Sequence, residues 1–111
     1  MNDKYERQMK KGVLDMLVLK LLESEPKYGY QIIQEMKEKS SETFLLKDGT
    51  LYPVLYRLED DGLVVSSWTE AKDKQTARKY YEITEDGKQA LDEIKAVWKY
   101  ISDGIEKIME D

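Results

Sequence analysis

The chain has 111 residues, which is enough for one small domain with a modest hydrophobic core. Cysteine and histidine are both absent, which excludes disulfides and thiolate metal sites and removes the usual general base. We therefore expect no enzyme, no cofactor and no metal site. No apolar run is long enough to span a bilayer and no leader peptide is visible, so we expect a cytoplasmic protein.

Charged residues make up 37% of the chain, and the net charge is −5, which taken alone argues against nucleic-acid binding. The charges are segregated, however. Acidic side chains are concentrated in Glu59–Asp61 and in the C-terminal quarter. Basic side chains are concentrated near the N-terminus, within residues 4–11, and in a second segment, within residues 72–79. Because the position of charge decides which partner a surface attracts, a basic face that contacts DNA is compatible with this composition.

The N-terminal part predicts one helix after a polar start. We expect residues 1–8 to be frayed, and Met9–Glu23 to form a helix that is apolar nearly all round. Such a helix must be covered on more than one side. We expect one side to cover the domain core and the other, with Leu14 and Leu17, to contact a second copy of the chain.

Two further helices follow. Pro26 interrupts the first helix, and Tyr28–Lys39 resumes helical spacing with a narrower apolar stripe. After a polar connector at Ser40–Thr43, the stretch Lys47–Gly62 predicts a helix that begins at Lys47–Asp48 and ends at Gly62. Two short amphipathic helices joined in this way are typical of a helix-turn-helix.

The helix within Lys47–Gly62 has two unlike faces. Its apolar stripe is Leu51, Val54, Leu55 and Leu58. The opposite face and its flanks carry Gly49, Thr50, Tyr52, Pro53, Tyr56, Arg57 and Asp60. Pro53 is tolerated only near a helix start, which places the start close to Gly49. Aromatic hydroxyls and a guanidinium suit phosphates and base edges. A surface helix that carries tyrosines by chance is the alternative.

A β-hairpin is predicted after this helix. Leu63–Thr69 and Arg78–Thr84 have strand-forming residues, and the loop between them holds Lys72 and Lys74. A two-stranded wing that follows a recognition helix can place cations over the phosphate backbone or in the minor groove. The alternative is a charged hairpin tip whose only role is solubility.

The C-terminal segment predicts a long helix with Thr84 as its N-cap. Apolar residues recur at alternating spacings of three and four, which is a heptad seam: Leu91, Ile94, Trp98, Ile101, Ile105 and Ile108. We therefore divide the chain into a DNA-binding domain, residues 1–84, and a dimerisation helix, residues 85–111. A helix that folds back on its own domain is the alternative.

Three sequence blocks, together with this order of elements, resemble the PadR family of bacterial transcriptional regulators. The blocks are YGYQI at Tyr28–Ile32, GTLYPVLYRLEDDGL at Gly49–Leu63 and RKYYEITEDG at Arg78–Gly87. The second block is highly specific, and the resemblance covers the chain from Gly12 onward. The family usually opens the second block with a Ser-Pro pair, whereas this chain has Lys47–Asp48 there.

The resemblance implies a mainly α-helical winged helix-turn-helix protein of the short subfamily, with a two-stranded β wing and a C-terminal dimerisation helix. It further implies a homodimer that binds a palindromic operator in double-stranded DNA, usually to repress transcription. We expect the DNA-facing residues to be Tyr28, Gly49, Thr50, Tyr52, Pro53, Tyr56, Arg57, Lys72, Lys74, Arg78 and Lys79. The alternative function is a winged-helix adaptor that binds protein and not DNA.

Phenolic acids and hydrophobic drugs are effectors of some members of this family. Some short drug-sensing members carry a tryptophan at the place that matches Trp98. One hypothesis is therefore that a planar aromatic or phenolic effector stacks on Trp98, in an apolar slot between the paired helices of two subunits. The near end of the first helix, with Met9 and Val13, would then line the mouth of this slot. The alternative is that Trp98 only fills the interface.

Overall fold

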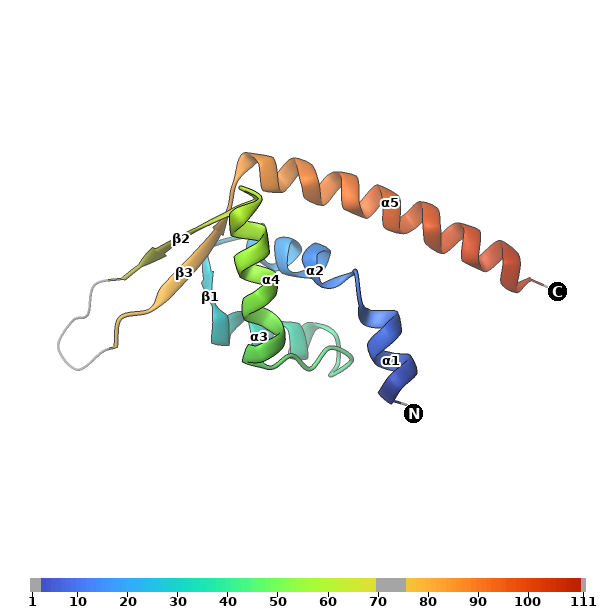
Figure 1. Cartoon of the computed structure of the whole chain (residues 1–111), viewed down its shortest axis with the longest axis horizontal. Helices are drawn as coiled ribbons and strands as arrows, with labels where there is room; N and C mark the ends of the chain where they lie inside the picture. Colours follow the sequence, from blue (N-terminus) through green and yellow to red (C-terminus); the bar gives the residue numbers. More distant parts are fainter. Residues whose placement is uncertain (1–2, 70–75, 111) are drawn as a thin grey trace.

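A computed structural model describes residues 3–69 and 76–110 of the chain (Figure 1). The predicted fold class is confirmed: helices dominate, and a small antiparallel sheet forms the wing. The elements in chain order are α1 (Asp3–Lys10), α2 (Leu14–Leu22), β1 (Lys27–Tyr28), α3 (Gly29–Lys39), α4 (Asp48–Asp60), β2 (Val64–Trp68), β3 (Lys79–Ile83) and α5 (Glu85–Met109).

The N-terminal prediction was wrong in two respects. Residues that we expected to be frayed form α1, and the single helix expected over Met9–Glu23 is broken between α1 and α2. Gly12 lies at the break with φ +85°, a left-handed conformation that glycine adopts without a steric penalty. The chain can therefore change direction there, and α1 has no buried residue.

The sheet has one strand more than the sequence predicted. Its order is β1-β3-β2, and both pairings are antiparallel, with Val64 opposite Ile83 and Tyr28 opposite Tyr80. The sequence assigned Tyr28 to the start of a helix, but its backbone is extended, with φ −93° and ψ 165°, and it caps α3. The β1 strand thus attaches the turn before α3 to the base of the wing.

The core lies between α2, α3, α4 and the inner face of the sheet. Helix α2 contacts α3, α4, β3 and α5, so its wide apolar surface is largely covered within its own chain. Leu14 and Leu17 are half-buried and pack against this core. The fully or nearly fully buried apolar side chains include Val18, Leu19, Leu22, Ile32, Leu51, Leu55, Leu58, Val64 and Tyr81.

Helix α5 begins on the domain and then leaves it. The predicted N-cap is confirmed, because the Gly87 N–H donates to Thr84 Oγ1 at 3.0 Å. A Cβ atom on Gly87 would lie 2.1 Å from the Leu63 carbonyl oxygen, so only glycine allows α5 to start this close to the chain. Leu91 is 0% exposed. We placed Leu91 in a subunit seam, but the structure buries it in the core of its own domain.

Beyond Ile94 the helix extends away from the wing, so the molecule is elongated (Figure 1). Its extents are 63 × 33 × 21 Å, and its radius of gyration is 15.9 Å. A compact domain of this length would have a radius of gyration of about 13 Å. Among the helices within residues 3–69 and 76–110, none has the length and apolar character needed to cross a membrane.

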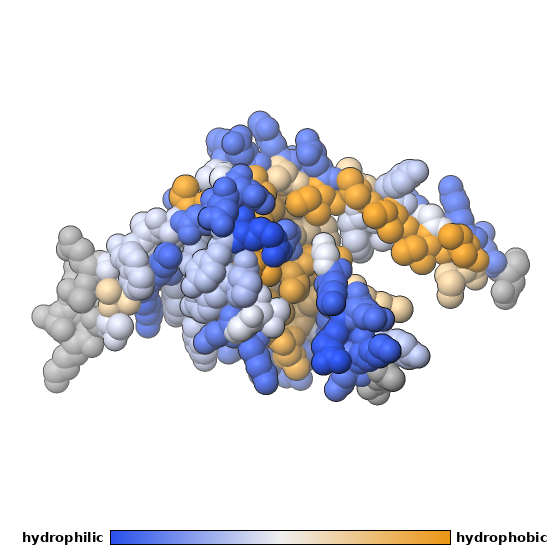
Figure 2. Space-filling view, in the orientation of Figure 1, coloured by the Kyte–Doolittle hydropathy of each residue, from blue (hydrophilic) through white to orange (hydrophobic). Residues whose placement is uncertain are grey.

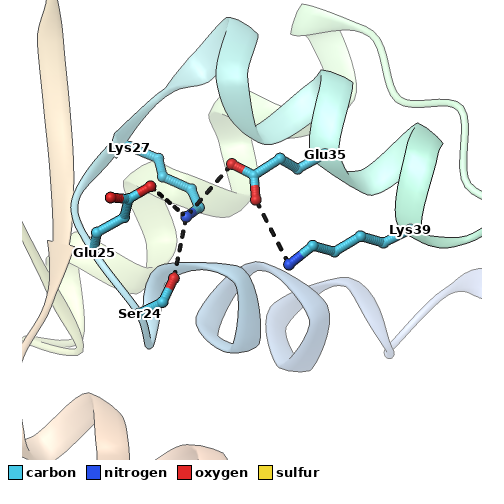
Figure 3. A network of polar contacts seen from close by, with 5 residues as sticks. All are labelled: Ser24, Glu25, Lys27, Glu35 and Lys39. Atoms are coloured by element: carbon cyan, nitrogen blue, oxygen red, sulfur yellow. Dashed lines mark hydrogen bonds and ion pairs between the residues drawn. The ribbon is translucent and has the colours of Figure 1, made fainter.

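A buried lysine ties β1 to α3 (Figure 3). The Lys27 side chain is only 2% exposed, and its Nζ lies 3.4 Å from Glu35 Oε2, 3.4 Å from Glu25 Oε1 and 3.3 Å from Ser24 Oγ. Lys39 approaches the other oxygen of Glu35 at 3.7 Å. A buried ammonium is stable only where such partners replace its water. The network therefore holds the turn between α2 and α3 in place.

We predict that the network is more sensitive to loss of Glu35 than to loss of Lys27. Glu35→Ala removes one of two carboxylates from a buried charge and is expected to cost roughly 1.5–3 kcal/mol of unfolding free energy. Lys27→Met keeps the buried volume and leaves Glu35 paired with Lys39, so it should cost less. Urea denaturation of both variants measures the difference, and a larger loss in Lys27→Met would contradict this prediction.

Candidate nucleic-acid interface

Helix α4 presents one buried and one exposed face, as its sequence predicted. Leu51, Val54, Leu55 and Leu58 are at most 5% exposed, which fixes the rotation of α4 about its axis. Because these positions share one face, the residues between them must point outward. The exposed residues of α4 are Asp48, Gly49, Thr50, Pro53, Tyr56, Arg57 and Asp60.

The start of α4 differs in detail from the prediction. Lys47 is the N-cap and provides no side-chain cap, while Asp48 is the first helical residue. Pro53 therefore lies in the second turn and not in the first. Since proline has no N–H, the Gly49 carbonyl oxygen has no backbone donor four residues later. The exposed first turn of α4 combines the positive end of the helix dipole, which favours anions, with a hydroxyl on Thr50.

The base of the wing holds a cation on an aromatic pair. The Tyr28 and Tyr80 rings meet edge to face with centroids 5.4 Å apart, which follows from their pairing across β1 and β3. The Arg78 guanidinium lies 4.5 Å from the Tyr28 ring centroid. Stacking on an aromatic face orients a guanidinium without neutralising its charge. Arg78 is exposed, so this charge is available to an anionic partner.

A second cation joins the wing to α4. Lys79 Nζ lies 5.9 Å from the Tyr56 ring centroid and 5.5 Å from that of Tyr81. Tyr56 in turn lies beside Tyr52, with ring centroids 6.0 Å apart. Lys79 is thus next to the exposed face of α4, whereas Arg78 lies on Tyr28 at the start of α3. Lys72 and Lys74, the other wing cations that we predicted, lie outside the described residues.

Two predicted DNA-facing side chains have partners within the protein. Arg57 Nη2 donates a hydrogen bond to Asp15 Oδ1 on α2, although the Arg57 side chain is still 53% exposed. Tyr52 is half-buried against the start of α3, where a Cβ on Gly29 would lie 2.3 Å from the Tyr52 hydroxyl oxygen. Tyr52 therefore packs α4 on α3 from the flank of the helix, where the sequence placed it, and is less accessible to a partner than Tyr56.

Some exposed residues beside this surface were missed. Tyr30 on α3 is 63% exposed, and Lys47 is exposed at the start of α4. Tyr80 completes the pair with Tyr28 at the base of the wing. The YGY spacing of Tyr28 and Tyr30 was the available signal for Tyr30. For Lys47 the sequence indicates only a place at the helix start.

Tyr81 lies beneath this surface and is fully buried. Its hydroxyl has no hydrogen-bond partner among the described residues. Burial raises the pKa of Tyr81 to about 12, and the neighbouring Tyr56 and Glu59 add to the effect. Tyr81 therefore stays neutral, and its role is to fill the space between the sheet and α4.

The predicted seam residues on α5 are exposed beyond the first turns. Trp98, Ile101 and Ile105 are 52–54% exposed and Ile108 is 83% exposed, while Ile94 is half-buried. Figure 2 shows an apolar band that follows α5 to its C-terminal end. Nothing else in the described part of this single chain covers the band.

The expected effector residues are not brought together within one chain. Val13 is half-buried against the domain core. Met9 is 82% exposed and lines a groove of about 470 Å³ between α1 and the connector before α4. The other residues that line this groove are Tyr5, Glu6, Lys10, Ser41, Glu42 and Thr43. A slot that includes Trp98 would require a second subunit.

These elements define a class of protein. Helices α3 and α4 form a helix-turn-helix, strands β2 and β3 form a wing beside α4, and the whole is a winged helix-turn-helix with an extended C-terminal helix. Comparison with known families gives a match of residues 18–93 to the transcriptional regulator PadR-like family. The chain belongs to this family, which confirms the resemblance found in its sequence.

Solved structures and a related sequence also support membership of this family. A PadR family transcriptional regulator from Eggerthella lenta is 34% identical with a TM-score of 0.86, over 97% of this chain and 91% of that one. A transcriptional regulator from Clostridium thermocellum is 29% identical with a TM-score of 0.86, over 93% and 99% of the two chains. A transcriptional regulator of Mycobacterium tuberculosis is 32% identical over 87 residues, which are 78% of this chain and 77% of that protein.

Proposed function

We propose that this regulator binds a palindromic DNA operator as a homodimer, represses transcription there, and is released by a small aromatic effector. The observation that supports DNA binding is that the exposed face of α4, with Thr50, Pro53 and Tyr56, adjoins the wing cation Lys79. Arg78 adds a second exposed cation, which lies on Tyr28 at the start of α3. Polar and aromatic groups on a rigid helix suit base edges, and adjacent cations suit the phosphates on either side.

In this arrangement α4 enters the major groove and the wing follows the adjacent backbone or minor groove. Helix α4 carries one positive and three negative side chains, so it cannot supply the attraction itself. The cations that flank it, Lys47, Arg78 and Lys79, do so. Charge position thus reconciles DNA binding with a net charge of −5.

Two alternatives to a DNA-binding repressor can be distinguished by measuring DNA binding and transcription. A winged-helix adaptor that binds protein would show no affinity for duplex DNA at low salt, because it has no phosphate contacts to lose. An activator would bind DNA but raise the amount of runoff transcript from a promoter that contains the bound site, whereas a repressor lowers it.

We predict that Arg78→Ala weakens binding to all duplexes. The slope of the logarithm of the binding constant against the logarithm of the salt concentration should become shallower by about one unit, since one phosphate contact is lost. Anisotropy titrations of a labelled duplex over a series of salt concentrations give this slope. Lys107→Ala, which removes the same charge from the last turn of α5, is the control. Equal effects of the two substitutions would show that only net charge matters.

The homodimer rests on the apolar band of α5. Val97, Trp98, Ile101, Ile105 and Ile108 are each more than half exposed, and such a contiguous band is unusual on a monomer. A heptad seam of this kind packs along another helix. A two-fold axis near this band makes the interface self-complementary and gives two α4 helices for two half-sites.

We predict that Ile101→Glu together with Ile105→Glu releases monomeric or unfolded chain, because both charges would be buried against the partner. Light scattering at micromolar concentration should give a dimer for the wild type. Gln89→Glu together with Tyr100→Glu adds the same charge at exposed positions of α5 outside the seam and should remain dimeric. A monomeric wild type would contradict the proposed dimer and, with it, the proposed palindromic operator.

The effector proposal rests on Trp98, which is 52% exposed in the middle of the seam. Two such side chains near the two-fold axis would hold the α5 helices apart and leave an apolar slot for a planar ligand. Stacking in the slot contributes about 0.5–1.5 kcal/mol per aromatic pair. The ligand releases DNA only if it binds more tightly to the dimer geometry that does not fit DNA.

We predict saturable quenching of tryptophan fluorescence by some compounds of a panel of planar aromatics and phenolic acids. Trp98→Ala should abolish it, because Trp68 lies on β2 and not on α5. Quenching that persists unchanged in Trp98→Ala would leave Trp98 as an interface residue only.

A further inference from the structure

The hydrogen-bonded ion pair between Arg57 and Asp15 joins the exposed face of α4 to the first turn of α2. The two residues are 42 positions apart in the chain. The Arg57 side chain is 53% exposed and the Asp15 side chain is 32% exposed. A pair this exposed contributes little to stability, so its effect on the surface charge of α4 is the more important consequence.

Arg57 is the only cation of α4. The same helix carries Asp48, Glu59 and Asp60, and Asp61 follows as its C-cap. Asp15 therefore neutralises the one positive side chain that α4 could offer to DNA. The partners are unequal in mobility, because α2 lies in the core and fixes Asp15, with Met16 beside it only 8% exposed. The long Arg57 side chain is the one that can move.

We infer that Asp15 competes with DNA phosphates for the Arg57 guanidinium and thereby lowers the affinity of the protein for duplex DNA of any sequence. This inference rests on the proposed DNA-binding function. Asp15 competes from within the molecule at hydrogen-bonding distance, so it acts at a high effective concentration. A phosphate must either displace it or approach Arg57 with a second anion beside it.

The contact therefore acts against non-specific binding, which depends almost entirely on phosphate neutralisation. Binding that relies on base contacts from the rest of α4 does not need Arg57 to be free. The pair is also consistent with the acidic character of the chain. Because Asp15 neutralises Arg57, the cation of α4, the cations of the wing provide most of the attraction to DNA phosphates.

The test is fluorescence anisotropy with a labelled random-sequence duplex at salt concentrations between about 50 and 200 mM. Asp15→Asn keeps the shape of the side chain and removes its charge. We expect it to raise the affinity for the random duplex about 3–10-fold and to steepen the salt slope by about one unit, because Arg57 gains a phosphate. In an Arg57→Gln background the same substitution should have no effect.

The control is Asp60→Asn, which removes the same charge from an exposed position on α4 that has no ion pair with Arg57. Equal gains in Asp15→Asn and Asp60→Asn, no gain, a loss of affinity in Asp15→Asn, or a gain that persists without Arg57 would each overturn the inference. If thermal unfolding shows that Asp15→Asn does not fold, Asp15→Ser replaces it. A wild-type protein that binds no duplex even at low salt would instead overturn the proposed function.

Discussion

The burial of four residues of α4 is the constraint on which the rest of the surface depends. Leu51, Val54, Leu55 and Leu58 are held against the core, so α4 can neither rotate nor shift without exposing them. Burying each such side chain stabilises the fold by about 1.5–3 kcal/mol relative to leaving it exposed. The outward direction of Thr50, Pro53 and Tyr56 is a consequence of this burial.

The contacts around α4 then decide what its exposed face can do. On one side Tyr56 meets Lys79 of the wing, and on another Arg57 meets Asp15 of α2. Lys79 is left beside the surface as an attractive charge, whereas Arg57 is paired with an acid. Arg57 and Lys79 on the candidate interface thus differ in their availability to a partner, because their neighbours differ.

Helix α5 packs on its own domain at one end only. The first turns of α5 are fixed by Gly87 and Leu91, whose burial belongs to the domain core. Beyond Ile94 the helix has an apolar band that no other described part of its own chain covers (Figure 2). The first turns of α5 therefore contribute to folding of the domain, and we propose that the rest of the helix contributes to dimer assembly.

The features that depend on local periodicity and local backbone chemistry can be predicted from the sequence. These are the two faces of α4, the β-hairpin, the Thr84 cap and the long helix α5. Helical and strand spacing specify such patterns within a few residues. The pairing of β1 with β3, the burial of Leu91 and the partner of Arg57 become visible only in the folded chain. Each of these joins segments distant in the chain, and no local pattern of residues encodes which distant group a side chain will meet.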